Sequence, residues 1–317
     1  MLSRLALAAV FVMTGAANAA TDSEASLPTA HGTLYGTLLQ PPNPVATALI
    51  LAGSGPTDRN GNNTMGLHTD VLKLLAQGLA AHGIATLRTD KRGIGQSAGA
   101  MQSEDDLRPQ TYADDAKAWA AQLRTQTGAP CIWLIGHSEG ALIGEVAAQD
   151  NGDICGLVLI CGPGRKLGDI IRAQLNGNPA NPADVKSEAN NILSALENGQ
   201  TVPNVPPILA PLFRASVQPY MIAELALDPA ALLATVKVPV LILQGDHDIQ
   251  VSVDDAKLLA AAKPDAKLVI LPGVNHILRD APADRAGNIA TYAKPDLPLA
   301  PGVVDTVANF IAAAKPG

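Results

Sequence analysis

A serine flanked by two glycines is the first residue whose setting suggests chemistry. Residues 136–140 read Gly-His-Ser-Glu-Gly, which fits the pattern G-x-S-x-G. They follow an apolar run (CIWLI, 131–135) and open a helical pattern (ALIGEVAAQ, 141–149). A serine at such a strand-to-helix turn has a strained backbone and an accessible hydroxyl, which suits a nucleophile in acyl transfer. We therefore predict that Ser138 is the nucleophile, and the alternative is a tight turn without chemistry.

A serine hydroxyl is a weak nucleophile and needs a histidine base, which an acid must orient. Of the six histidines, His276 lies in a loop (PGVNH) directly after the last predicted strand, and Asp248 lies in a loop (QGDHD) after the preceding strand. The chain order Ser138, Asp248, His276 is the one that accompanies a strand-to-helix serine. We expect Asp246 to accept backbone N–H groups in its turn. The alternatives are that the two aspartates exchange roles, or that His276 is an ordinary surface residue.

A tetrahedral acyl intermediate also requires hydrogen-bond donors for its oxyanion. The backbone N–H of Glu139, the residue after the nucleophile, is the first predicted donor. The backbone N–H of Ser54 is the second, because the loop at 52–56 (AGSGP) follows a predicted strand and its glycines allow close approach. The alternative is that this loop is only a turn. His137 precedes the serine on a strand, so we expect its side chain to point away from the hydroxyl.

These residues must be positioned by a regular alternation of apolar runs and helical patterns. Continuous apolar runs are typical of parallel strands covered on both faces, and they occur at 47–52, 84–88, 132–135, 157–160, 239–243 and 268–271. Helical patterns occur at 65–82, 112–127, 138–149, 253–262 and 303–314. This alternation predicts an α/β fold with a mostly parallel, doubly wound sheet and right-handed crossovers. Residues 32–39 alternate instead and predict an antiparallel edge strand.

One segment, residues 165–236, interrupts this alternation. It has no clear strand pattern, and its helical stretches are separated by Pro- and Asn-rich breaks. A structureless loop of that length would be unusual in a compact domain, so we predict a helical cap inserted between core segments 20–164 and 237–317. Apolar cap residues could line an acyl pocket or simply pack the cap onto the core, and they are Ile208, Leu209, Leu212, Phe213, Tyr220 and Met221.

The N-terminus has the three regions of a signal peptide. A short positive start precedes an apolar run, and Ala17-Asn18-Ala19 matches a cleavage site. We therefore expect residues 1–19 to be removed, a mature start near Ala20, and a periplasmic or secreted protein. A buried N-terminal helix is the alternative. The mature chain has no cysteine at its start for a lipid anchor and no later stretch that reads as a transmembrane helix.

Three cysteines remain in what should be an oxidising compartment. Cys155 and Cys161 flank one predicted strand and would lie roughly 20 Å apart, too far for a bridge. Cys131 and Cys155 open two successive strands that should be parallel neighbours, so a Cys131–Cys155 disulfide is a hypothesis. The alternative is buried free thiols.

The composition narrows the classes of partner. A net charge of −7 gives no electrostatic reason to expect nucleic acid or an anionic membrane. Aromatic residues make up only 3% of the chain, which disfavours a base-stacking platform. The cysteine and histidine spacings do not resemble a metal site. We therefore expect neither a metal nor a cofactor, and a small-molecule substrate.

Two further segments carry a family resemblance. Residues 53–61 (GSGPTDRNG) resemble the oxyanion loop of bacterial acyl-esterases, and residues 90–97 (DKRGIGQS) resemble the D-x-R-G-x-G-x-S turn of many α/β-hydrolases. With the triad order, the chain resembles the α/β-hydrolase superfamily over nearly its whole mature length, in a serine acyl-esterase branch similar to serine aminopeptidase-like and lipase-like sequences. The resemblance implies that Asp90 and Arg92 organise loops around the site. The chain departs from many lipases and esterases at Ala52, where they carry histidine.

The predicted function is hydrolysis of a carboxylic ester, with a short-chain acyl group preferred. A peptidase or amidase on the same scaffold is the nearest alternative, because acyl transfer to serine serves both reactions. A non-catalytic binding protein of the same fold is the other alternative. Hydrolases with a carboxylate nucleophile are disfavoured because the nucleophile position holds Ser138.

Overall fold

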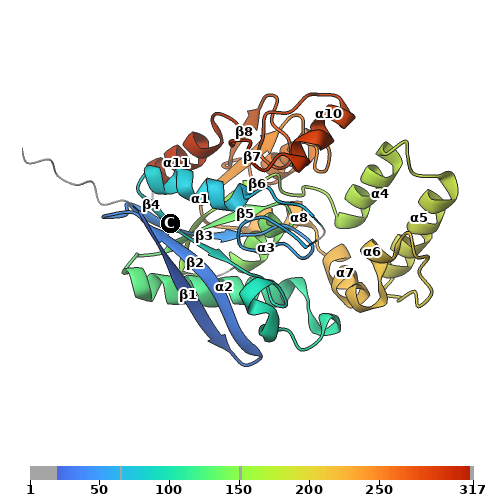
Figure 1. The fold of residues 1–317 in the computed structure, drawn as a ribbon, viewed down its shortest axis with the longest axis horizontal. Coiled ribbons are helices and arrows are strands. Elements are labelled where there is room, and N and C mark those ends of the chain that lie inside the picture. The colour runs from blue at the N-terminus through green and yellow to red at the C-terminus, as the bar shows by residue number, and fades with distance from the viewer. Residues whose placement is uncertain (1–19, 65, 150–151, 315–317) are drawn as a thin grey trace, which may run out of the picture.

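The core of the protein is one eight-stranded sheet, seen in a computed structural model that describes residues 20–64, 66–149 and 152–314 (Figure 1). The strands follow the order β1-β2-β4-β3-β5-β6-β7-β8. Neighbours from β4 to β8 pair in parallel, whereas β1–β2 and β2–β4 pair antiparallel. The strands are β1 (Thr21–Thr29), β2 (Gly32–Gln40), β3 (Ala46–Leu51), β4 (Ile84–Thr89), β5 (Ile132–His137), β6 (Ile154–Ile160), β7 (Val240–Gly245) and β8 (Lys267–Leu271). The predicted mostly parallel α/β sheet is confirmed.

The prediction was wrong about the edge of the sheet. The strand expected there, β2, lies between β1 and β4, and β1 forms the edge. The sequence of β1 is mostly polar, and of its side chains only Ala25 and Leu27 are buried. An edge strand needs few apolar residues because half of its surroundings is solvent, so β1 lacks the pattern by which the other strands were found.

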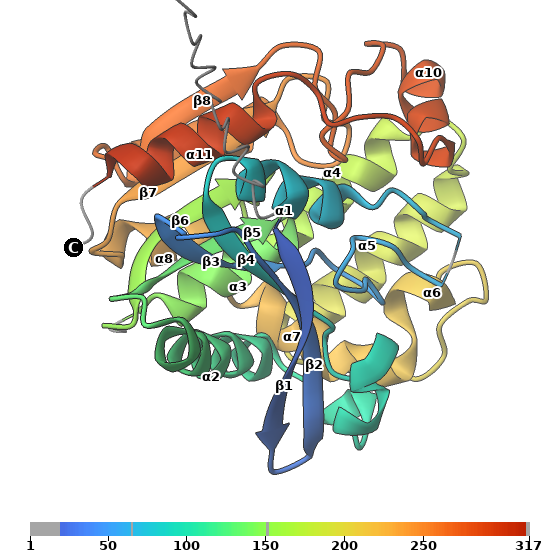
Figure 2. The same cartoon turned by 60° about the vertical axis from the view of Figure 1, so that its left-hand side comes forward.

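Helices cover both faces of the sheet (Figures 1 and 2). On one face, α1 (Val71–Ala81) and α11 (Val303–Ala313) share an apolar core with the strands. On the other face, α2 (Pro109–Thr127), α3 (Glu139–Ala147) and α9 (Val253–Ala262) form a second core. The first helix begins six residues later than expected at 65, because residues 66–70 are not helical.

The segment expected to form a cap is helical. Four helices, α4 (Leu167–Gly177), α5 (Ala183–Glu197), α6 (Ala210–Phe213) and α7 (Gln218–Leu225), enclose an apolar cluster of their own and project together from one end of the molecule (Figure 1). The next helix, α8 (Pro229–Thr235), instead contributes Leu233 to the core beneath α3 and α9. We therefore propose that α4–α7 form the cap and that α8 returns the chain to the core.

The remaining helices are short and lie in the loops around the sheet. They are α10 (Arg285–Ala290) and the 3₁₀ helices η1 (Gly95–Ala100), η2 (Glu104–Asp106), η3 (Ala215–Val217) and η4 (Thr291–Ala293). Among the described helices, none is both long and apolar enough to cross a membrane. The predicted signal peptide, residues 1–19, lies outside the described residues.

A disulfide joins Cys131 to Cys155, with 5.1 Å between their Cα atoms. It bridges the starts of β5 and β6, which are parallel neighbours. Adjacent strands lie close enough for such a bridge, so the disulfide hypothesis is confirmed. Cys161, at the other end of β6, is a buried free thiol.

Candidate active site

Ser138 occupies a strained turn between β5 and α3. Its φ is 55° and its ψ is −125°, a conformation that is costly for a residue with a side chain. Two glycines make the turn sterically possible. A Cβ atom on Gly136 would lie 2.2 Å from the Gly140 carbonyl oxygen, and one on Gly140 would lie 2.3 Å from the Leu51 carbonyl oxygen. The G-x-S-x-G pattern is thus required by the close packing of α3 against β3 and β5.

The loops after β7 and β8 bring Asp248 and His276 into direct contact. His276 Nδ1 lies 2.7 Å from Asp248 Oδ2, and both side chains are buried. The other carboxylate oxygen of Asp248 accepts the backbone N–H groups of Gln250 and Val251, at 2.7 and 3.0 Å. Gln244 Nε2 donates to Oδ2 at 3.1 Å. The acid is therefore held by hydrogen bonds on both oxygens.

This environment favours the ionised form of Asp248. Burial raises the pKa of Asp248, but the charge and hydrogen bond of His276 and the two backbone N–H groups outweigh it, so the pKa lies below its ordinary value. An ionised Asp248 accepts a hydrogen bond from the Nδ1–H group of His276. In neutral His276 this leaves Nε2 as the acceptor, which is the tautomer that a general base requires.

Asp246, the other aspartate of the loop, has a different partner. Its Oδ1 accepts the backbone N–H of Gly273 at 2.7 Å. His247 lies between the two aspartates, and its Nδ1 is 2.6 Å from the Ala281 carbonyl oxygen. Asp246 thus links the loop after β7 to the loop after β8, in keeping with the backbone role expected for it, and Asp248 contacts the histidine.

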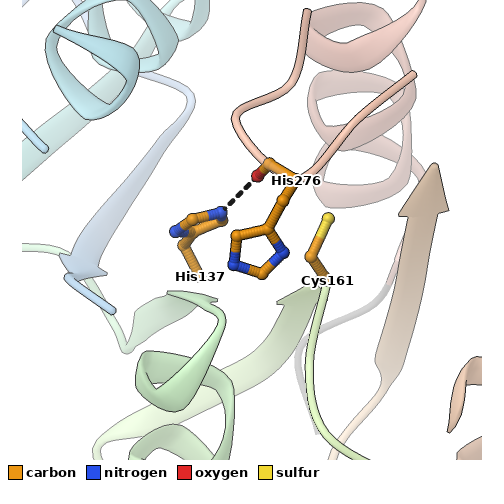
Figure 3. Close-up of side chains that lie close together, drawn as sticks. All are labelled: His137, Cys161 and His276. Atoms are coloured by element: carbon orange, nitrogen blue, oxygen red, sulfur yellow. Dashed lines mark hydrogen bonds between the residues drawn. The ribbon is translucent and has the colours of Figure 1, made fainter. Parts of the chain in front are cut away.

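His137 supports the loop that carries His276. Its Nε2 lies 2.8 Å from the His276 carbonyl oxygen, and the two ring centroids are 4.9 Å apart (Figure 3). Because a carbonyl only accepts, Nε2 must carry the proton. Burial, followed by the nearby His276, lowers the pKa of His137 to about 4. Sequence reasoning missed this contact, since it joins residues 139 positions apart.

Cys161 lies on the other side of the His276 ring (Figure 3). Ligand-capable atoms of His137, Cys161 and His276 lie within 4.8 Å of one another. However, Nδ1 of His276 is engaged by Asp248, and Nε2 of His137 is engaged by a carbonyl oxygen. One ring nitrogen of each histidine is thus already hydrogen-bonded.

The loop after β3 approaches Ser138 closely. A Cβ atom built on Gly53 would lie 3.2 Å from the Ser138 Cβ atom, so only glycine fits without displacement. The Ser54 residue that follows is exposed. Glu139 begins α3, where the first N–H groups of a helix have no intrahelical partner and can serve an anion.

The D-x-R-G segment braces this loop, as the resemblance implied. Asp90 accepts the backbone N–H of Arg59 at 2.9 Å and its guanidinium at 2.6 Å. Arg92 donates to Asp115 on α2 at 2.7 Å. Asp90 and Arg92 therefore tie the loop after β4 to the loop after β3 and to α2, and neither contacts the triad residues directly in these bonds.

A cleft between cap and core opens beside the loop after β3. Its walls include Pro56, Lys91, Tyr112 and Glu139 from the core and Arg214 and Tyr220 from the cap. The Tyr220 hydroxyl donates to Glu139 Oε1 at 2.7 Å, and Arg214 Nε donates to Glu104 Oε2 at 2.9 Å. The cap is thus hydrogen-bonded to the core on both sides of the cleft.

The six apolar cap residues proposed from the sequence as pocket or packing residues have different surroundings in the structure. Leu209, Phe213 and Met221 belong to the apolar cluster of the cap. Ile208 and Leu212 are exposed, at 65% and 38%. Of the six, Tyr220 alone is among the residues that line the cleft described above.

Comparison with known proteins agrees with this architecture. The chain is 25% identical over 242 residues to Esterase EstD of Thermotoga maritima, and the match covers 74% of this chain but 55% of EstD. The chain therefore spans about half the length of that relative. Among solved structures, the Pyrococcus furiosus esterase Pf2001 superposes with a TM-score of 0.57 at 16% identity, covering 93% of each chain. A proline iminopeptidase from Mycobacterium smegmatis gives 0.58 at 16% identity, covering 91% of this chain and 97% of its own.

At these identities the solved structures support the fold alone. The family membership of the chain rests on a different comparison. The family model described as "Alpha/beta hydrolase family" matches residues 24–287. That range contains the strained serine, both aspartates and His276. The protein belongs to the alpha/beta hydrolase family.

Proposed function

We propose that this protein is a serine hydrolase that cleaves carboxylic esters with Ser138, His276 and Asp248. The observation that carries the proposal is the hydrogen bond from His276 Nδ1 to a buried, ionised Asp248, at the same edge of the sheet as the strained Ser138. The carboxyl ends of β5, β7 and β8 share that edge because these strands are parallel. The similarity to EstD supports an ester as the substrate.

The proposed reaction proceeds through an acyl-enzyme. His276 Nε2 removes the proton from the Ser138 hydroxyl as its oxygen attacks the ester carbonyl. Asp248 holds the imidazole in the required tautomer and stabilises the imidazolium that forms. The backbone N–H groups of Ser54 and Glu139 bind the oxyanion. The alcohol leaves with the proton from His276, and water then releases the acid by the same route.

We propose a short-chain acyl ester as the substrate. The cleft lined by Gly55 and Glu139 is closed on one side by the cap, through the Tyr220–Glu139 hydrogen bond. A cleft bounded in this way encloses a compact group better than a long acyl chain.

We also propose that the mature protein works in the periplasm or outside the cell. The Cys131–Cys155 disulfide supports this location, because such bonds persist in oxidising compartments. Sequencing the N-terminus of the protein recovered from cell fractions tests the proposal, and a first residue near Ala20 is expected.

The test of the activity is hydrolysis of p-nitrophenyl acetate, butyrate and octanoate by wild type and Ser138→Ala. Turnover should fall by roughly 10⁴-fold or more in the variant, and acetate or butyrate should be cleaved faster than octanoate. Ser187→Ala, a change on the exposed face of α5, is the matched control and should keep wild-type rates. Equal rates in wild type and Ser138→Ala would refute the proposal, and cleavage of amino-acid p-nitroanilides alone would favour a peptidase.

A further inference from the structure

Lys91 lies beside the candidate oxyanion site and has no role in the proposed triad. It is the residue between Asp90 and Arg92, both of which are fixed by ion pairs. Its Nζ atom lies 2.6 Å from the Gly53 carbonyl oxygen, and its side chain is only 12% exposed. A largely enclosed ammonium group thus donates to a backbone carbonyl in the loop that approaches Ser138.

The Gly53 carbonyl and the Ser54 N–H belong to the same peptide group. A peptide group is planar, and in the trans form its carbonyl and N–H point in opposite directions. A cation bound at the oxygen therefore fixes the direction in which the N–H points. It also draws electron density toward the oxygen, which makes the N–H a stronger donor. Charge-assisted hydrogen bonds of this kind are about twice as strong as neutral ones.

The same ammonium group lies close to the residue that supplies the other candidate donor. Lys91 Nζ is 3.5 Å from Glu139 Oε2, and Glu139 Oε1 accepts the hydroxyl of Tyr220 at 2.7 Å. The ring of Tyr112 lies 5.5 Å from Nζ. Lys91 is closer to the neutral carbonyl than to the carboxylate, so its position is set for the Gly53 peptide and not solely for an ion pair.

We propose that Lys91 is a positioning residue for the oxyanion hole, which holds and polarises the Gly53–Ser54 peptide so that its N–H meets the developing negative charge. The inference rests on the proposed serine-hydrolase function. Lys91 acts through the peptide and does not contact the reacting atoms. Its loss should therefore weaken binding of the transition state and leave binding of the substrate nearly unchanged.

The first experiment compares wild type, Lys91→Met and Lys91→Arg on p-nitrophenyl butyrate. Deleting an oxyanion donor costs about 10²–10³ in kcat, and misorienting one should cost less. We expect kcat to fall roughly 10- to 100-fold in Lys91→Met with KM within about twofold, and Lys91→Arg to recover part of the loss. Lys117→Met, which removes a lysine paired with Asp114 on the outside of α2, is the matched control.

The second experiment measures inhibition by butylboronic acid, whose adduct with the serine has a tetrahedral, negatively charged boron. Its Ki should rise by the same factor by which kcat falls, because both depend on the oxyanion donors. In addition, ethylammonium ions should restore part of the activity of Lys91→Ala and leave Ser138→Ala inactive. A lysine that only stabilises the fold would lower the melting temperature without this correlation or rescue.

The outcomes separate the inference from the proposed function. If wild type shows Ser138-dependent ester hydrolysis, while folded Lys91→Met keeps wild-type kcat and boronate affinity, the inference about Lys91 is refuted and the function stands. If KM rises and kcat is unchanged, Lys91 binds the substrate instead, and the inference also fails. If wild type itself has no Ser138-dependent esterase activity, the proposed function falls.

Discussion

Replacing Glu145 by glutamine should stabilise the protein increasingly as the pH rises. Glu145 lies on α3, the helix that follows the turn at Ser138, and its side chain is completely buried. Within the described part of the chain, neither of its carboxyl oxygens has a hydrogen-bond partner. Burial, with a smaller effect of the Asp228 charge, raises the pKa of Glu145 well above its ordinary value of 4.5. The folded protein therefore holds this carboxyl group protonated at a pH where the unfolded chain releases the proton.

The sign and size of the effect follow from proton linkage. An acid with a raised pKa in the folded state makes the free energy of unfolding decrease as the pH rises above the unfolded pKa. The slope is about 1.4 kcal/mol per pH unit for as long as the folded group stays protonated. Glutamine has nearly the same shape and does not titrate. Relative to wild type, Glu145→Gln should therefore gain up to about 1.4 kcal/mol for each pH unit above 5.

Urea unfolding at pH 5, 6, 7 and 8 measures this difference, with the buried Trp119 and Trp133 as fluorescence probes. Subtracting wild type from the variant at each pH cancels the titration of all other groups. Glu188→Gln, a change on α5 at a residue that is not buried, is the control and should show no pH-dependent gain. A stability difference that stays constant from pH 5 to pH 8 would show that Glu145 is ionised or hydrated in the folded protein, and the reasoning would be wrong.

Three further predictions concern the site and the disulfide. Asp248→Asn should lower kcat by about 10⁴-fold, because the amide oxygen would stay with the backbone N–H groups of Gln250 and Val251 and the amide NH2 would face His276 Nδ1, which favours the wrong tautomer. Asp246→Asn should cost less than about tenfold. The reverse order in steady-state assays would mean that the two aspartates exchange roles. His137→Phe removes the hydrogen bond from His137 to the loop that carries His276. One hydrogen bond corresponds to a five- to tenfold loss, so kcat should fall by about that factor. An unchanged kcat would show that this hydrogen bond does not help to position His276. Cys155→Ser should lower the free energy of unfolding by about 3 kcal/mol, because it removes the disulfide. In urea unfolding, reduced wild type should be as stable as the variant. Equal stability of the variant and oxidised wild type would contradict this prediction.

Local sequence patterns predicted the parallel part of the sheet and the candidate residues of the site. The parallel strands are buried on both faces, so each is a continuous apolar run that can be read directly. Ser138 could be recognised because the strained turn and the approach of α3 to β3 exclude side chains at Gly136 and Gly140. Asp248 and His276 could be proposed because each follows a strand, and parallel strands end at one edge. Each of these features depends on residues that are close together in the sequence, so it can be predicted without the tertiary structure.

Other features depend on contacts between distant segments and needed the tertiary structure. Local sequence favoured Asp248 as the acid and left an exchange of roles with Asp246 as the alternative, and the pairing with His276 Nδ1 is visible only when the loops after β7 and β8 meet. The polar edge strand β1 carries no apolar run and is defined by its pairing with β2. The contacts of Lys91 with Gly53 and of His137 with the His276 carbonyl are hydrogen bonds to backbone atoms. A backbone acceptor is present at every residue, so no residue type in the sequence marks it, and only the folded chain selects which one is used.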